Sequence, residues 1–172
     1  SSFAELIAHL KFLNNRKRIA VANAVDSHTL EAVLRASDSG FVEAFLIGDL
    51  AMIESPLFFE HKLTPYVHII DIPEVEQATR EAVRMVKSGE ADILMKGLVN
   101  TDVILRAILD KENGIVEKGK IITYNAALEI PSYHKLLFFT DPAVIPSPTV
   151  EQRTAMIKYV TETAHKFGIA RP

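Results

Sequence analysis

The sequence contains no cysteine. Disulfide bonds, thiolate metal sites and a cysteine nucleophile are therefore excluded, while this absence is compatible with any cellular compartment. The chain also lacks an apolar run that approaches the roughly 20 residues of a membrane-spanning helix. Its first residues, SSFAELIAHLKFL, have the pattern of an amphipathic helix and contain no signal-type cleavage site. We therefore predict a cytoplasmic protein that has no membrane partner.

Charge of one sign is not in marked excess either. The formal net charge is -3, and acidic and basic residues are interleaved along the chain. Because a nucleic-acid-binding protein needs a basic face that neutralises phosphates, the sequence predicts no nucleic-acid partner. Small molecules or proteins are the expected partners.

Several fingerprints of common active sites are missing. The sequence has neither a Walker motif nor G-x-G-x-x-G, which removes the usual nucleotide-binding signatures. Its six histidines show no H-E-x-x-H or comparable spacing, so we predict no zinc site. The serines in turns lack the glycine pattern of a nucleophile elbow, which leaves an acyl-serine mechanism without support. The apolar runs LFF at 57–59 and LLFF at 136–139 are interpreted as core rather than as an acyl pocket.

The chain is rich in residues that build a core. Hydrophobic residues make up 48% of its 172 residues and there are only seven glycines. We therefore expect a compact one-domain or small two-lobed protein, and predict a single α/β domain over residues 1–172. Short continuous apolar runs alternate with segments of helical period, which is typical of an open, mostly parallel, doubly wound sheet flanked by helices. The predicted strands are 18–22, 44–47, 67–70, 92–95 and 136–139.

Two predicted helices have clear end signals. The first follows Pro73 and stops at Gly89. The second starts at Thr149, which has capping-box spacing with Gln152, and stops at Gly168. The residues predicted to face inward on the second helix are Val150, Ile157, Val160, Ala164 and Phe167.

Two segments interrupt the alternation of strands and helices. Residues 120–139, KIITYNAALEIPSYHKLLFF, offer two apolar runs separated by Pro131 and Ser132, with no room for a helix. We predict a hairpin or antiparallel insertion there. At the C-terminus, HKFGIARP is a helix stop followed by the approach to a further strand. The chain is therefore expected to be the front part of a longer protein.

Short polar side chains follow the predicted strands. In an open α/β sheet, ligands bind beyond the carboxyl ends of the strands, so these positions are candidates for a binding site. Asn23 and Asp26 lie in the first of these segments. The full set is 23–27, 48–49, 71, 96–101 and 140–142.

The loop at 96–101 is the strongest candidate among them. Gly97 would let backbone approach a ligand closely, and free amides at the start of the next helix would point towards it. Lys96 adds a compact positive charge that suits phosphate. We therefore predict that Lys96, Gly97, Asn100 and Thr101 bind a phosphate or another anion. Asp102, in the first helical turn, would repel an anion, so its carboxylate should point aside.

A simpler interpretation of the same residues stays open. A lysine after a strand is often only a solvated charge, and Asn100 or Thr101 before a helix is often only a cap worth about 1 kcal/mol. Judged by local pattern alone, this interpretation is the more frequent one. Asp26 and Asp141 could likewise be metal ligands or ordinary helix caps, and the sequence does not choose between these roles. No metal ligand is assigned.

Three blocks of the sequence together resemble the phosphate acetyl/butyryltransferases, most closely the phosphotransbutyrylase branch. The similarity runs from about Arg18 to the end of the chain, and the blocks fall in the expected order. The blocks are RIAVANAVDSHTLEAVLRAS at 18–37, ADILMKGLVNTDVILRAIL at 91–109 and LLFFTDPAVIPSPTVEQRTAMIKYVTETAHKFGI at 136–169.

This resemblance implies an enzyme that interconverts acyl-CoA plus inorganic phosphate with acyl phosphate plus free CoA. Such enzymes need no metal and no bound cofactor, because coenzyme A is a substrate. The implied architecture is isocitrate/isopropylmalate dehydrogenase-like, with a cleft between two α/β domains, and a homo-oligomer is expected. The residues at 96–101 would lie near the phosphate or acyl phosphate. The implied cleft-lining residues are Asn23, Asp26, Asp141 and Pro142.

The chain differs in length from the members of the family that it resembles. Family members are nearly twice as long, and the serine- and arginine-bearing segments thought to stabilise the transition state lie in the C-terminal half that is absent here. An incomplete two-domain fold is therefore expected, and no catalytic acid, base or nucleophile is assigned. One alternative is a non-catalytic acyl-CoA-sensing regulatory domain of the kind appended to malic enzymes. A decarboxylating dehydrogenase of related architecture would need a dinucleotide site and a metal site, and the sequence shows neither.

Overall fold

The computed structural model describes residues 2–54 and 64–172, so the apolar run at 57–59 lies outside the described residues. The chain divides into two compact units, one formed by Leu10–Val116 and the other by Ser1–His9 together with Glu117–Pro172. They are called the sheet unit and the hairpin unit below. None of the helices within the described residues has both the length and the apolar character needed to cross a membrane. The expectation of a single domain stays a prediction.

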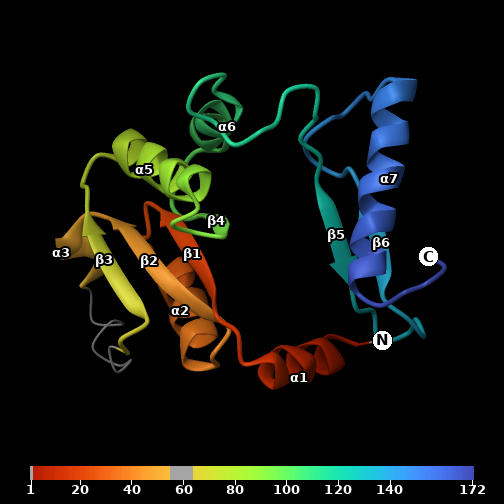
Figure 1. Ribbon diagram of the computed structural model, residues 1–172, viewed down its shortest axis with the longest axis horizontal. Helices are drawn as coiled ribbons and strands as arrows, with labels where there is room; N and C mark the ends of the chain where they lie inside the picture. The colour runs from red at the N-terminus through yellow and green to blue at the C-terminus, as the bar shows by residue number, and fades with distance from the viewer. Residues whose placement is uncertain (1, 55–63) are drawn as a thin grey trace. The chain divides into compact units, whose positions relative to one another are not determined.

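The sheet unit is built on a four-stranded sheet in which every pair is parallel. Its strand order is β3-β2-β1-β4 (Figure 1). The strands lie where the sequence predicts them, and the central strand β1 is buried over its last residues, 19–22. The strands are β1 (Lys17–Ala22), β2 (Val42–Gly48), β3 (Val67–Asp71) and β4 (Ile93–Lys96).

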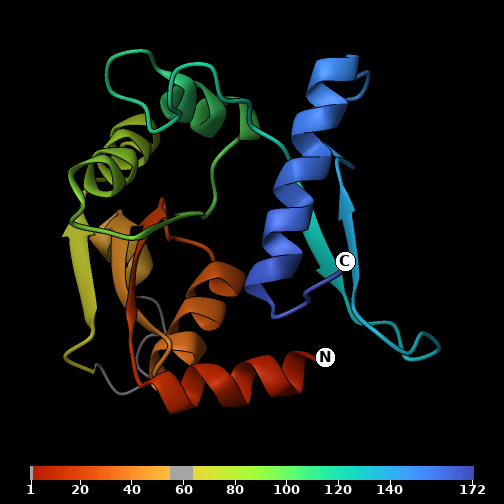
Figure 2. The same ribbon diagram turned by 45° about the vertical axis from the view of Figure 1, so that its right-hand side comes forward.

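Helices cover both faces of this sheet, as the predicted doubly wound fold requires (Figure 2). α2 (Ser27–Asp38) and α3 (Leu50–Ile53) pack on one face, whereas α5 (Val75–Ser88) and α6 (Thr101–Leu109) pack on the other. Successive residues of a strand point to opposite faces, so a continuous apolar strand can serve two cores. The first core includes Val21, Leu30, Val33, Leu34 and Leu46, and the second includes Ala20, Ile47, Ala78, Met85 and Ile104.

The strand order creates a topological switch point between β1 and β4. The chain runs from β1 to β2 and β3 on one side of β1, and then crosses through α5 to β4 on its other side. The helices that follow β1 and β4 pack on opposite faces, so the loops after these two strands diverge. In open α/β sheets, ligands bind at this position.

The helices with predicted end signals begin and end as expected. The Glu74 side chain caps α5 by accepting hydrogen bonds from backbone N–H groups, and α5 stops at Gly89, whose φ of 79° is left-handed. In the hairpin unit, Thr149 and Gln152 form the predicted capping box of the last helix. Gly168, with a φ of 80°, follows the end of that helix.

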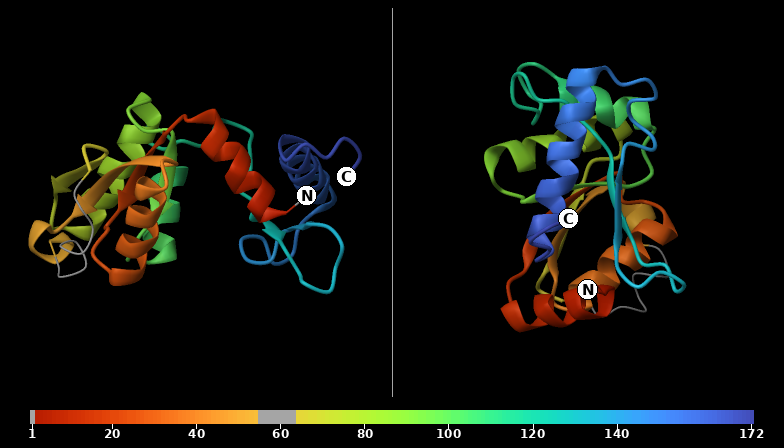
Figure 3. Two further views of the ribbon diagram at one scale, coloured as in Figure 1. Left: turned by 90° about the horizontal axis from the view of Figure 1, so that it is seen from below. Right: turned by 90° about the vertical axis from the view of Figure 1, so that its right-hand side faces the viewer.

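The hairpin unit contains the predicted antiparallel insertion. β5 (Asn125–Leu128) and β6 (Leu137–Thr140) form a two-stranded antiparallel sheet, and α7 (Val150–Lys166) lies along it (Figures 1 and 3). The rings of Phe138 and Phe167 meet edge to face with 5.2 Å between centroids. A further helix, α1 (Phe3–Leu13), precedes β1 in the chain.

The predicted inward face of α7 is partly wrong. Ala164 is buried as expected, but Val150 and Ile157 are 75% and 65% exposed. Met156, which was not assigned to that face, is buried instead. The described partner of α7 is a two-stranded sheet, and such a narrow surface covers only a narrow stripe of a helix.

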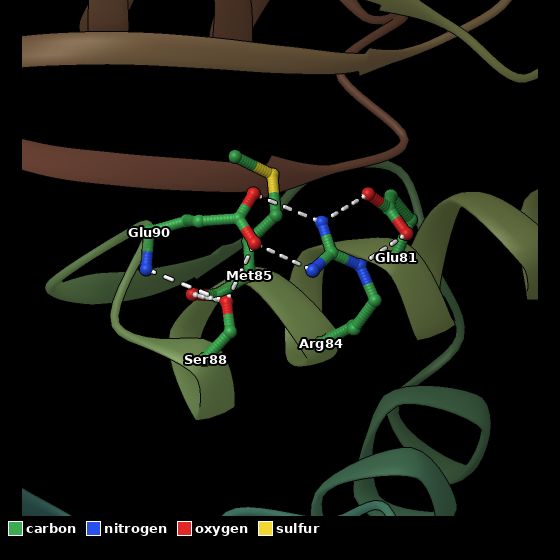
Figure 4. A network of polar contacts seen from close by, with 5 residues as sticks. All are labelled: Glu81, Arg84, Met85, Ser88 and Glu90. Carbon is green, nitrogen blue, oxygen red and sulfur yellow. Dashed lines mark hydrogen bonds and ion pairs between the residues drawn. The ribbon is translucent and has the colours of Figure 1, made fainter.

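An ion-pair network fixes the turn between α5 and β4 (Figure 4). Arg84 donates to Glu81 on the helix, with 2.7 Å between Nη2 and Oε1, and to Glu90 beyond it, with 2.6 Å between Nη1 and Oε1. The single O–H of Ser88 is shared between two acceptors, the Met85 carbonyl oxygen at 3.1 Å and Glu90 Oε1 at 2.9 Å from Oγ. Hydrogen bonds from Arg84, and then from Ser88, lower the pKa of Glu90 to about 2.

Glu90→Gln is expected to make the free energy of unfolding less sensitive to acid. The folded-state pKa of Glu90, about 2, lies below its ordinary value of 4.5, so the stabilisation is present above the ordinary value and is lost as the pH falls towards 2. Urea unfolding at about pH 5 and about pH 2.5 should show a smaller acid-induced loss in the variant than in the unmodified chain. Glu31→Gln, which removes the exposed 3.3 Å ion pair with Arg35 on α2, is the control. An acid dependence in Glu90→Gln equal to that of the control would contradict this prediction.

Candidate functional site

Hydrogen bonds join the loops that follow β1 and β4. The Gly97 N–H donates to the Ala22 carbonyl oxygen at 2.9 Å, and the Leu98 N–H donates to the Asn23 carbonyl oxygen at 3.0 Å. The Asn23 side-chain Nδ2 donates to the Leu98 carbonyl oxygen at 2.7 Å. The structure therefore brings Asn23 and the predicted anion-binding loop at 96–101 together at the topological switch point.

Gly97 is buried and allows the two loops to approach each other closely. A Cβ atom at this position would lie 2.4 Å from the Asn23 carbonyl oxygen and 2.6 Å from the Ala22 carbonyl oxygen. Both are backbone atoms, which cannot rotate away as a side chain can. The close approach that Gly97 makes possible in the structure is thus to the loop after β1. Its predicted approach to a ligand stays a prediction.

Lys96 is the last residue of β4 and its side chain is exposed. It forms no ion pair with any residue in the described ranges 2–54 and 64–172, whereas Arg18, Arg84 and Arg106 all have carboxylate partners. A compact ammonium group without a counterion at the carboxyl edge of the sheet is available to an anionic ligand.

The start of α6 has no side-chain cap. Asn100 occupies the N-cap position in an extended conformation, but its side chain makes no capping hydrogen bond. The capping interpretation of the Asn100 side chain is therefore not supported. Unpaired N–H groups and the helix dipole favour an anion at such an end. The side chains of Asp26, Asp49, Glu74 and Thr149 do cap α2, α3, α5 and α7.

The carboxylate of Asp102 points aside, as an anion site requires. Its Oδ2 lies 3.0 Å from Nη2 of Arg106, one turn further along α6. The guanidinium group offsets the negative charge that would otherwise act near the start of the helix. The first turn of α6 thus carries a carboxylate that is already paired.

Asp26 serves as the N-cap of α2. Its Oδ2 accepts a hydrogen bond from the Thr29 N–H at 2.9 Å. Burial alone would raise the pKa of Asp26, but the hydrogen bonds from Thr29, its own backbone N–H and the charge of nearby His28 together outweigh burial, and the net pKa is lowered. Within the described part of the chain, no group of three or more His, Cys, Asp or Glu residues could hold a metal ion. The structure thus supports the capping interpretation of Asp26.

Asp141 and Pro142 belong to the hairpin unit. The Asp141 carboxylate accepts hydrogen bonds from the N–H groups of Tyr124, Ala143 and Val144, at distances of 3.1, 3.0 and 2.8 Å. Burial opposes ionisation of Asp141, but these bonds outweigh it and lower its pKa. The residue therefore organises the turn that follows β6. Its predicted role in a cleft wall, and that of Pro142, stay predictions.

A groove of about 650 Å³ lies between α5 and α6, and sequence reasoning missed it. None of the predicted anion-binding residues lines it. The arginines on its rim are already paired, for example Arg80 with Glu76 at 3.5 Å. The surfaces of two successive helices form this groove together, so no motif within one helix could have marked it.

Comparison with known proteins assigns the chain to a family. The family described as "Phosphate acetyl/butaryl transferase" matches residues 73–172, which include the loop at 96–101 and the turn at 140–142. The chain belongs to this family. The resemblance found in the sequence is thereby confirmed.

Two relatives in this family have similar identity to the chain but different names. The phosphate butyryltransferase of Clostridium beijerinckii is 38% identical over 172 residues, covering 99% of this chain and 56% of the relative. The phosphate acetyltransferase of Thermotoga maritima is 37% identical over 159 residues, covering 91% of this chain and 52% of the relative. The chain spans about half the length of the curated relatives that it matches.

A solved structure supports the fold of this family member. The branched-chain phosphotransacylase from Enterococcus faecalis superposes with a TM-score of 0.74 at 22% sequence identity, covering 91% of this chain and 54% of that chain. The predicted α/β fold class is confirmed, and the chain corresponds to about half of the superposed protein.

Sequence reasoning located the loop of this phosphate acetyl/butyryl transferase family member but missed that Asn23 contacts it. Asn23 is 5% exposed and bonds to Leu98, and its predicted place in a cleft wall stays a prediction. Its φ of 54° is left-handed. An asparagine directly after a strand is the available signal, because Asn is among the few non-glycine residues that adopt this conformation readily.

Proposed function

We propose that this chain is part of a phosphate acyltransferase that interconverts acyl-CoA plus phosphate with acyl phosphate plus free CoA. One observation carries the proposal. Lys96 is exposed and has no ion-pair partner among the described residues, and the loop that follows it leads to the start of α6, which the Asn100 side chain does not cap. Both lie within the residues that the family matches. The names of the relatives, phosphate butyryltransferase and phosphate acetyltransferase, support the reaction class.

The loop at 96–101 is proposed to bind the phosphate group. Lys96 would supply a positive charge, and the N–H groups at Asn100 and Thr101 would donate hydrogen bonds to phosphate oxygens. Gly97 would keep the loop close to β1. Asn23, Asp26, Asp141 and Pro142 are proposed to form parts of the cleft wall.

The proposed reaction transfers the acyl group between sulfur and oxygen. The CoA thiolate attacks the carbonyl carbon of the acyl phosphate, a carbon–sulfur bond forms, and the carbon–oxygen bond to phosphate breaks. Phosphate leaves with the electron pair of that bond. Negative charge that develops on the leaving phosphate is stabilised by a nearby cation and by N–H donors. The residues of this chain would bind and orient the phosphate, and no catalytic acid, base or nucleophile is assigned to them.

Coenzyme A enters this proposal as a substrate, with no bound cofactor. A cytoplasmic homo-oligomer is the proposed state of the protein. The family and its named relatives give no support to the alternative of an acyl-CoA-sensing domain of the kind appended to malic enzymes.

The proposal is tested by following free-thiol release from acetyl-, butyryl- and isobutyryl-CoA with inorganic phosphate. The chain and the protein from the complete reading frame that carries it are assayed side by side. We expect phosphate-dependent release by the longer protein, and the relative rates then assign the acyl group. Thiol release that does not depend on phosphate, or acyl-CoA binding without any release in the longer protein, would contradict the proposal.

A further inference from the structure

Leu98 is held in place through its backbone. Its side chain is 58% exposed, so packing of that side chain contributes little to fixing the loop. Its N–H and its carbonyl oxygen are both bonded to Asn23, at 3.0 and 2.7 Å. The next residue, Val99, is buried and leads directly to the start of α6. One residue of the loop after β1 therefore fixes the middle of the loop at 96–101.

The conformation of Asn23 makes this double contact possible. Its left-handed backbone, with a φ of 54°, directs its carbonyl oxygen to the Leu98 N–H and its side-chain amide to the Leu98 carbonyl oxygen. Asn23 is 5% exposed, so the Nδ2 bond is largely shielded from water. Removal of the Nδ2 group would leave a carbonyl oxygen without this partner at the switch point.

We infer that Asn23 is a positioning residue that holds Lys96 and the start of α6 in the geometry that binds phosphate. This inference rests on the proposed function. Lys96 precedes the fixed segment and Asn100 follows it, so a shift of Leu98 moves the ammonium group and the helix N–H groups relative to each other. Loss of the Nδ2 bond should then weaken phosphate use without a matching effect on acyl-CoA.

Two variants of the protein from the complete reading frame test this role. Asn23→Gly keeps the left-handed backbone free of strain and removes the Nδ2 donor. Asn23→Asp keeps the size of the side chain but places an acceptor against the Leu98 carbonyl oxygen. Each is expected to raise the KM for phosphate by about three- to tenfold in phosphate-dependent thiol release, with the KM for acyl-CoA changed by less than about twofold.

Asn14→Gly is the matched control, because Asn14 is exposed and also has a left-handed φ, of 45°. It makes the same chemical change before β1, and both KM values should stay at those of the unmodified protein. Equal increases in the two KM values in Asn23→Gly, or a loss of stability with both KM values unchanged, would overturn the positioning role. A phosphate KM in Asn23→Asp equal to that of the unmodified protein would also overturn it. Absence of phosphate-dependent release in the unmodified protein would instead overturn the proposed function, and this inference with it.

Discussion

Lys96→Ala is expected to raise the KM for phosphate or acyl phosphate by about ten- to hundredfold in the protein from the complete reading frame. A hydrogen bond to a charged group contributes about 1.5–3 kcal/mol, which corresponds to this range. Lys96 has no carboxylate partner among the described residues, so its removal leaves none of their carboxylates without a partner. The KM for acyl-CoA should change by less than about threefold, because the lost charge is proposed to act on the phosphate alone.

Lys17→Ala provides a matched control for the change in net charge. Lys17 is exposed and begins β1, so it lies at the amino ends of the parallel strands, whereas Lys96 lies at the carboxyl end of β4. It should leave the KM for phosphate unchanged, since a surface charge far from the bound anion is screened by salt. Equal losses for phosphate and acyl-CoA in Lys96→Ala, or no loss for either, would reject the proposed role of Lys96.

Gly97→Ala is expected to lower the free energy of unfolding of the chain by about 1–3 kcal/mol. The new Cβ would lie 2.4 Å from the Asn23 carbonyl oxygen and 2.9 Å from the Asn23 carbonyl carbon. Real Cβ atoms do not approach backbone this closely, so the loops after β1 and β4 must move apart. That movement stretches the hydrogen bonds to Ala22 and Asn23 that join the two strands. Urea unfolding monitored by circular dichroism measures the change.

Leu98→Ala is the control for this stability prediction. It changes the neighbouring residue, whose side chain is 58% exposed. It keeps both hydrogen bonds that the Leu98 backbone makes with Asn23, one to the Asn23 carbonyl oxygen and one from its side-chain Nδ2. The expected change in the free energy of unfolding is within about 0.5 kcal/mol of zero. A Gly97→Ala chain as stable as the unmodified chain would show that the two loops do not need to be this close.

Much of the fold followed from local patterns. The strands at 18–22 and 44–47 were found because a strand buried on both faces must be apolar at consecutive positions. The ends of α5 followed from residues whose conformations are restricted, such as the left-handed Gly89. The inward face of α7 was less predictable, because the stripe that is buried depends on the width of the partner and not on the helix alone.

The candidate site was only half visible in the sequence. Lys96 and Gly97 stood out because a charged residue and a glycine interrupt an apolar pattern at a strand end. The lack of a capping bond at Asn100 was not visible, since Asn is a common capping residue and its rotamer depends on neighbours. Asp102 was expected to point aside, but its partner Arg106 was not named, although their spacing on one helix permits the pair.

The sequence by itself determined the types and order of the strands and helices, and it indicated the family. These depend on the periodicity of apolar residues and on residues with restricted backbone conformations, and both are properties of each segment alone. Only the tertiary structure decided which loops meet. The order β3-β2-β1-β4 places β4 beside β1, and so sets Asn23 against Leu98, 75 positions later in the chain. Strand order is fixed by the packing of helices on both faces of the sheet, a property of the whole fold that no single segment encodes.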